Sequence, residues 1–203
     1  MDEDQIMGNL FRQAEQYIKQ IQTDDVFVEI GSARGAQGST HHFAQLAHSH
    51  GTVLHSVDID DRSHIFQYIP EGVIGHQAPG SEWSKYTFPT LNKKIALLYL
   101  DNYDYNYWVG DNCQMIQDQL IEYQTKYNIT LNNTDCTVEH LKQMINLLPY
   151  MSSDSVVICD DTFLYNDCWI GKCGPAVVYL LACGWEVAHL TLDCGVILTR
   201  KKK

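Results

Sequence analysis

The stretch VFVEIGSARGAQGST, residues 26–40, decides the fold class of this chain. Its apolar run contains one acid, Glu29, and stops at Gly31, after which Gly35 and Gly38 follow. A buried strand that runs into a glycine-rich turn is typical of an α/β sheet that binds a nucleotide-like ligand at that turn. The spacing lacks the close glycine pair that lets a backbone approach a pyrophosphate, and no Gly-Lys-Ser/Thr follows, as a P-loop requires. The turn therefore favours a ligand with a ribose but no phosphate.

The rest of the chain alternates predicted strands with predicted helices. Apolar periodicity predicts helices over residues 4–22, 40–50, 109–125, 137–148 and 174–184, and strands over 26–30, 52–60, 73–74, 95–100, 155–159, 185–190 and 195–200. This order predicts an α/β, doubly wound, Rossmann-like sheet of seven mostly parallel strands, with an antiparallel last strand and helices on both faces. We expect one domain over residues 1–203, with an N-terminal helix within 1–23 and a basic tail at 200–203.

Charge and composition argue against several functional classes. The net charge of −11 at pH 7 repels phosphate backbones, so we expect no nucleic-acid partner. The apolar runs are shorter than the roughly 20 residues of a transmembrane helix, and the N-terminus lacks the features of a signal peptide. Seven cysteines without a CxxC pair indicate free thiols in a reducing compartment, which predicts a cytoplasmic protein. The sequence leaves open whether the chain forms a homodimer.

Polar or glycine residues follow each of the first five predicted strands. They are Gly31-Ser32, Asp58-Ile59, Gly75-His76, Asp101-Asn102 and Asp160-Asp161. Parallel strands bring their carboxyl ends to one edge of the sheet, where ligands of such folds bind. Buried carboxylates are costly unless they are paired, so acids at three strand ends indicate a functional site more than they indicate packing.

Two of these motifs together resemble a known family. VEIGSARG, residues 28–35, followed by SVDID, residues 56–60, resembles the first two motifs of class I S-adenosylmethionine-dependent methyltransferases, and the likeness extends from Val26 to Arg200. The resemblance implies S-adenosylmethionine as the cofactor. The residues that it places at the cofactor are Glu29, Gly31, Ser32, Gly35, Asp58, Ile59, His76 and Asp101.

Two later motifs are similar to those of metal-dependent O-methyltransferases. These are LYLDNYDYNYW, residues 98–108, and VVICDDTF, residues 156–163, and the similar groups are the macrocin O-methyltransferases and the cephalosporin hydroxylase-like (rhamnosyl O-methyltransferase) proteins. The resemblance implies a divalent ion, Mg²⁺ by its preference for oxygen ligands, held by Asp101, Asp160 and Asp161. It also implies a catalytic base just beyond Asp101, where the nearest acid in this chain is Asp104.

The activity that these motifs imply is transfer of a methyl group to the hydroxyl of a small-molecule acceptor. A non-catalytic methyltransferase-like domain that binds the cofactor or a protein is the second hypothesis. An NAD-binding oxidoreductase is the third, and the glycine spacing disfavours it.

Several residue groups keep two interpretations. Asp160-Asp161 could simply cap a turn, and the histidines of helix 40–50 favour a solvated face over a zinc site. The aromatic residues at the strand ends form either a hydrophobic lid or an acceptor pocket that stacks a ring or sugar. They are Tyr103, Tyr105, Tyr107 and Trp108, with Trp83 and Trp169 from other predicted loops.

Overall fold

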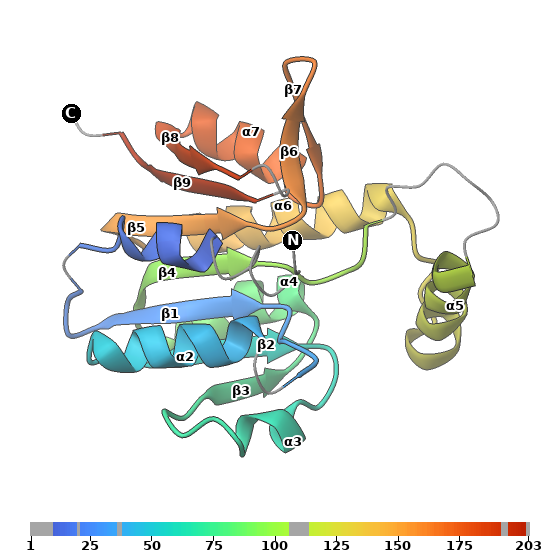
Figure 1. Ribbon diagram of the computed structural model, residues 1–203, viewed down its shortest axis with the longest axis horizontal. Coiled ribbons are helices and arrows are strands. Elements are labelled where there is room, and N and C mark those ends of the chain that lie inside the picture. The colour runs from blue at the N-terminus through green and yellow to red at the C-terminus, as the bar shows by residue number, and fades with distance from the viewer. Residues whose placement is uncertain (1–9, 20, 36–37, 106–113, 192–194, 202–203) are drawn as a thin grey trace.

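A seven-stranded sheet forms the centre of the protein (Figure 1). The computed structural model describes residues 10–19, 21–35, 38–105, 114–191 and 195–201. The strand order is β3-β2-β1-β4-β5-β9-β8, and a separate hairpin consists of β6 and β7. The strands are β1 (Asp25–Ile30), β2 (Leu54–Asp58), β3 (Ile74–Gln77), β4 (Lys94–Leu100), β5 (Met151–Cys159), β6 (Thr162–Tyr165), β7 (Cys168–Gly171), β8 (Trp185–Leu190) and β9 (Val196–Arg200).

The strand directions confirm the predicted fold class. Strands β1 to β5 pair in parallel, whereas β9 is antiparallel to both β5 and β8. The register places Glu29 of β1 beside Ser56 of β2 and Tyr99 of β4. The carboxyl ends of β1, β2, β4 and β5 therefore lie along one edge, which is the edge where the glycine turn begins.

Helices cover both faces of this sheet (Figure 1). One face packs against the helix at 10–15 and α2, and the other packs against α6 and α7, whereas α5 stands apart beyond the carboxyl ends of the strands. The helices are α2 (Ser39–Ser49), α3 (Ser63–Phe66), α4 (Gly80–Glu82), α5 (Gln114–Glu122), α6 (Asn133–Leu147) and α7 (Gly174–Ala182). Short π- or 3₁₀-helical segments are η1 (Trp83–Thr87), η2 (Phe88–Leu91), η3 (Tyr123–Tyr127) and η4 (Leu148–Tyr150).

The core consists of two apolar clusters, one on each face of the sheet. Strand β4 contributes to both, because Leu98 and Leu100 belong to one cluster and Leu97 and Tyr99 belong to the other. A strand that is buried on both faces has the continuous apolar sequence from which 95–100 was predicted as a strand. The sheet edge that carries the site is thereby fixed by packing on both sides.

Three local features differ from the sequence predictions. The N-terminal helix ends at residue 15, short of the predicted residue 22, because the chain tightens into i→i−3 hydrogen bonds up to Ile18. The segment 80–91, predicted as a loop, is helical in α4, η1 and η2. The β6–β7 hairpin was not predicted. Within the described residues, no helix is long and apolar enough to cross a membrane.

Candidate active site

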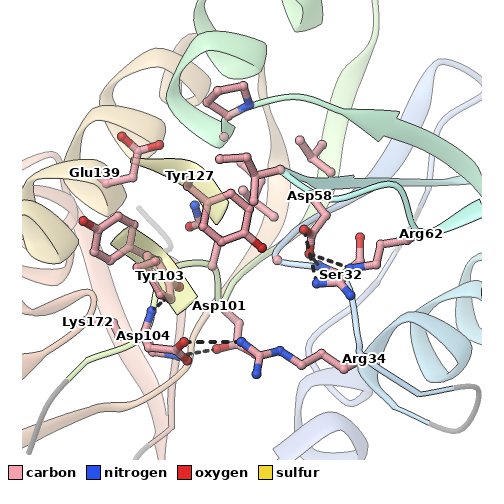
Figure 2. A pocket seen from close by; sticks show the side chains of 18 of the residues that line it. Ser32, Arg34, Asp58, Arg62, Asp101, Tyr103, Asp104, Tyr127, Glu139 and Lys172 are labelled. Carbon is pink, nitrogen blue, oxygen red and sulfur yellow. Dashed lines mark hydrogen bonds and ion pairs between the residues drawn. The ribbon is translucent and has the colours of Figure 1, made fainter. Parts of the chain in front are cut away.

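A cavity of about 470 Å³ opens at the carboxyl edge of the sheet (Figure 2). Its volume lies in the range of small-molecule sites, roughly 300–1,000 Å³. The predicted residues that line it are Gly31, Ser32, Asp58, Ile59, Asp101, Asp104, Asp160 and Asp161. We call Gly31, Ser32, Asp58, Ile59 and Arg62 the β1–β2 half, and Asp101, Asp160, Asp161 and Lys172 the β4–β5 half. The cavity therefore brings together residues from turns that are far apart in the sequence.

The glycine turn of the β1–β2 half is held against the turn that follows β4. Gly31 has a φ of +99°, and a Cβ atom there would lie 2.5 Å from the carbonyl oxygen of Asp101. Its own amide donates to the Val57 carbonyl oxygen at 2.8 Å. A Cβ on Gly35 would meet nothing within 4 Å, and Gly35 does not line the cavity. Gly31 is thus required by the close approach of two backbones, and Gly35 is not.

Asp58 faces the cavity from the end of β2 (Figure 2). Its carboxylate accepts hydrogen bonds from the backbone amides of Ser32, at 3.1 Å, and Asp60, at 2.8 Å. The guanidinium of Arg62 lies 3.2 Å from it as an ion pair, and the pair is mostly shielded from solvent. The same carboxylate therefore links the turn after β1 to the turn after β2, with its charge met by backbone donors and by an arginine.

Glu29 supports this turn from below. Its carboxylate accepts from the Ser39 hydroxyl at 2.5 Å and from the Ser56 hydroxyl at 2.6 Å. The side chain is fully buried and does not line the cavity. Burial raises the pKa of Glu29 to about 7, against the two hydroxyl donors, which act to lower it. These contacts hold the first turn of α2 against β1 and β2, and a contact with the cofactor stays a prediction.

In the β4–β5 half, a buried lysine lies between carboxylates from two strands. The ammonium of Lys172 is 2.7 Å from Oδ1 of Asp101 and 2.8 Å from Oδ2 of Asp161. Only 6% of the lysine side chain is exposed. These carboxylates act to raise the pKa of Lys172 well above its ordinary value, against the burial that acts to lower it. The lysine is therefore a fixed positive charge at the cavity wall.

Tyr99 connects the remaining carboxylate oxygens of this half. Its hydroxyl lies 2.6 Å from Oδ2 of Asp160 and 3.1 Å from Oδ2 of Asp101. A phenol has one proton to donate, so it can satisfy only one of two ionised carboxylates. Burial, and next the charge of Asp101, raise the pKa of Asp160 to about 7. The contact with Asp160 is the shorter of the two, and both carboxylates therefore compete for the same phenol proton.

The β6–β7 hairpin delivers Lys172 to this position. The chain leaves β5 through Asp161 and returns at Lys172, whose amide donates to the Asp161 carbonyl oxygen at 3.0 Å. Gly171 has a φ of +97°, and a Cβ there would lie 2.0 Å from that carbonyl oxygen. Asp161 itself has a φ of 46°, in the left-handed region that non-glycine residues rarely adopt. The start and end of the hairpin are thus closed on each other by backbone contacts.

The magnesium site that the sequence predicted is not supported. Among the described residues, no group of three or more histidine, cysteine, aspartate or glutamate side chains could hold a metal ion. The Asp101 and Asp161 oxygens that would bind the ion are in contact with the Lys172 ammonium, and Asp160 accepts a hydrogen bond from Tyr99. The donor set as it stands therefore does not fit a divalent cation.

At the rim of the cavity, charged side chains bridge its walls. Arg34, from the glycine turn, pairs with Asp104, from the turn after β4, at 3.3 Å (Figure 2). Lys126 and the Tyr127 hydroxyl of η3 both bind Oδ2 of Asp60, at 2.7 and 2.8 Å. The segment that carries α5 and η3 is thereby tied to the turn after β2 across the mouth of the cavity.

Other predicted residues lie elsewhere. His76 is outside the cavity, where its Nε2 is 2.9 Å from Nδ1 of His55 and its ring packs on Trp83. Of the two interpretations of Trp83, its burial favours a hydrophobic role, since only 1% of it is exposed and it belongs to the core. Trp169 also packs against the core and away from the cavity lining. Tyr103 lines the cavity, whereas Tyr107 and Trp108 lie outside the described residues.

Sequence reasoning missed several residues that line the cavity. They are Arg34, Arg62, Tyr127, Glu139 and Lys172. The sequence did contain a signal for Lys172, because TFLY and CWIG are short strand-like runs separated by only two residues, Asn166 and Asp167. Both of these residues have a positive φ in the structure. That pattern is typical of a tight hairpin. A hairpin there returns the chain to the carboxyl end of β5 and places Lys172 beside Asp161.

Comparisons with known proteins bear on the fold of the chain. The sequence matches no protein-family profile and no curated protein. A putative rRNA methylase from Clostridium thermocellum is structurally similar, with a TM-score of 0.53, 10% identity, and coverage of 97% of this chain and 97% of that chain. The protein has a methyltransferase fold.

Two O-methyltransferases are among further structures that are similar to this chain. The TDP-rhamnose 3'-O-methyltransferase CalS11 of calicheamicin biosynthesis has a TM-score of 0.50 and 13% identity, covering 97% of this chain and 78% of that chain. The O-methyltransferase NovP has a TM-score of 0.50 and 15% identity, covering 97% and 79%. Identities this low establish the shared fold alone, so the acceptor has to be inferred from the site.

Proposed function

We propose that the protein is an S-adenosylmethionine-dependent methyltransferase that methylates a hydroxyl of a small molecule. The charge of the cavity carries this proposal. Seven acidic side chains line it, against three basic ones: Asp58, Asp101, Asp104, Asp160, Asp161, Glu122 and Glu139, with Arg34, Arg62 and Lys172. Such a surface attracts a cationic sulfonium cofactor and repels the pyrophosphate of NAD. The alternative of an NAD-binding oxidoreductase is disfavoured for the same reason.

The β1–β2 half suits the cofactor. Gly31 and Ser32 present backbone at the start of the cavity, and the Asp58 carboxylate is placed to accept from ribose hydroxyls. Ile59 offers an apolar surface beside it. The β4–β5 half, with Asp104 and Lys172 in the lining of the same cavity, would then hold the acceptor.

Asp104 is the proposed base of the reaction. It lines the cavity near the rim, and its carboxylate pairs with Arg34, which holds it in place. Asp104 would accept the proton of the acceptor hydroxyl, and the hydroxyl oxygen would take the methyl group. S-adenosylmethionine, when bound, would supply that methyl group and would leave as S-adenosylhomocysteine, with the electron pair of the carbon–sulfur bond kept by sulfur. Positioning of the acceptor for this in-line displacement supplies much of the rate.

The setting that we infer for this activity is the cytoplasm, with a small-molecule acceptor, no nucleic-acid partner, and either a monomer or a homodimer as the assembly. The net charge of −11 supports the absence of a nucleic-acid partner. A cavity of about 470 Å³ also suits a small acceptor better than a folded macromolecule.

Calorimetric titration with S-adenosylhomocysteine tests the proposal. We expect binding by the wild type, a loss of at least about tenfold in affinity for Asp58→Ala, and no binding of NAD. A methyl-release assay over hydroxyl acceptors then separates an enzyme from a non-catalytic domain. Asp104→Asn should lower kcat by about 10²-fold or more while leaving S-adenosylhomocysteine affinity unchanged. If NAD bound and S-adenosylhomocysteine did not, the proposal would be wrong.

A further inference from the structure

The carboxylates of the β4–β5 half already have a cation of their own. We propose that the Lys172 ammonium is the resident cation of this half, that it takes the place of a divalent ion, and that its presence excludes such an ion. The catalytic meaning of this inference rests on the proposed methyltransferase function, whereas its physical content, exclusion of a metal by a lysine, does not.

The position of the ammonium supports the proposal directly. Its nitrogen lies 2.7 Å from Asp101 and 2.8 Å from Asp161, carboxylates that come from the ends of two different strands. A magnesium or calcium ion bound to the same oxygens needs oxygen distances of about 2.0–2.6 Å. Such an ion would have to occupy the space of the ammonium, next to its positive charge. Lysine and metal are therefore mutually exclusive at this place.

The backbone keeps the lysine from leaving. The Lys172 amide donates to the Asp161 carbonyl oxygen at 3.0 Å, and the next amide, of Cys173, donates to the Thr162 hydroxyl at 3.0 Å. Gly171 fits only without a Cβ against the same carbonyl. Because the lysine is anchored at its own backbone and 94% of its side chain is buried, an arriving ion cannot push it into solvent without opening the hairpin.

The same ammonium can do part of the work that a metal would do for the acceptor. A lysine ammonium carries three N–H donors; that of Lys172 donates to Asp101 and forms an ion pair with Asp161. Because Lys172 lines the cavity, we infer that its remaining donor capacity serves an acceptor oxygen there. A donor and positive charge there stabilise the negative charge that develops on that oxygen as its proton leaves. Lys172 is therefore also a positioning residue, because it holds both carboxylates at the acceptor side.

Manganese binding, followed by the paramagnetic resonance signal of free Mn²⁺, tests the exclusion. Four purified proteins are compared: the wild type, Lys172→Ala, Lys172→Arg and Lys126→Ala. Lys126 is the matched control, because it also pairs with an aspartate but lies at the rim. We expect Lys172→Ala to bind Mn²⁺ at least about tenfold more tightly than the other three proteins. The added affinity should vanish in the double variant Lys172→Ala with Asp161→Asn.

Two results would overturn the inference. One is Mn²⁺ binding to the wild type as tight as to Lys172→Ala and sensitive to Asp161→Asn. The other is a folded Lys172→Ala protein, checked by circular dichroism, that gains no affinity. If that variant does not fold, thermal melts of the wild type still test the inference. A melting temperature that rises with millimolar Mn²⁺ in the wild type, but not in Asp161→Asn, would also contradict exclusion of the ion. S-adenosylhomocysteine binding is measured in parallel, and its failure in the wild type would sink the proposed function without affecting these metal results.

Discussion

The two halves of the cavity compensate the negative charge of their carboxylates in different ways. In the β1–β2 half, backbone amides and Arg62 meet the charge of Asp58. In the β4–β5 half, one buried lysine meets the charges of Asp101 and Asp161. The first arrangement spreads compensation over several donors, and the second concentrates it in a single side chain. Loss of one group should therefore be tolerated in the first half and not in the second.

The contact that joins the two halves should give the largest effect when it is broken. In Gly31→Ala the new Cβ would collide with the Asp101 backbone, and the φ of +99° would be strained. We expect a loss of about 4 kcal/mol in the free energy of unfolding, from overpacking and strain together. Urea denaturation measures it. Gly35→Ala is the control and should stay within about 0.5 kcal/mol, since nothing lies within 4 Å of its Cβ. Equal effects at the two glycines would contradict the described turn.

Replacing the cations compares the two halves directly. Lys172→Met should lower the free energy of unfolding by about 3 kcal/mol, because it removes the buried cation that Asp101 and Asp161 share. Arg62→Met should cost about 1 kcal/mol, because Asp58 keeps its two backbone donors. Urea denaturation of both variants at neutral pH measures the difference. If Arg62→Met were the more damaging change, the division of the cavity into two electrostatic regimes would be wrong.

The pH dependence of stability tests Glu29, the support of the β1–β2 half. The pKa of the Glu29 carboxyl is about 7 in the folded protein, against an ordinary value of 4.5 that applies to the unfolded chain. Between pH 4.5 and pH 7 the unfolded chain therefore holds fewer protons than the folded protein. Stability must then fall as pH rises through this window, with a slope of up to about 1.4 kcal/mol per pH unit, and level off above pH 7.

The difference between the wild type and Glu29→Gln isolates this contribution, because His55 and His140 titrate in both. A difference curve for Glu29→Gln that is flat, or that rises with pH, would show that the buried carboxylate stays ionised in the folded protein.

The rim should give the smallest effect. The Lys126 ammonium binds Asp60 with 48% of its side chain exposed, so solvent and salt screen the pair. Lys126→Met should therefore lower the free energy of unfolding by less than about 1 kcal/mol, and added salt should remove most of the difference. Thermal melts at low and high salt check this. A loss as large as that of Lys172→Met would contradict this, because it would mean that the ion pair between η3 and the turn after β2 stabilises the whole fold and not the rim alone.

Much of this architecture could be predicted from sequence because it depends on local patterns. The run 95–100 is apolar throughout because β4 is buried on both faces. Acids directly after apolar runs predicted that Asp58, Asp101 and Asp160 would gather at one edge, and they line one cavity. The glycine turn also predicted that Gly31 would lie at this edge, and it lines the same cavity.

The rest depends on long-range contacts that no local pattern encodes. That Lys172 lies against Asp101, 71 residues earlier, follows from how far the hairpin folds back on β5. The resemblance to metal-dependent enzymes rests on the acids alone and takes no account of Lys172, so it predicted a magnesium site that the described residues do not support. Gly35 is a second case, since its place in a motif predicted a cofactor contact and it does not line the cavity.

The left-handed backbone of Asp161 has an evolutionary consequence. An aspartate with a φ of 46° holds its conformation at a cost of about 1 kcal/mol that glycine would avoid. Glycine would remove that cost, but it would also take one of its two carboxylates from the buried Lys172 ammonium, and breaking such a pair costs more than the strain. Selection for thermal robustness should therefore keep the acid for as long as the lysine is present. Directed evolution for heat tolerance, run without a requirement for activity, should accumulate glycine at position 161 only in variants that have also lost Lys172.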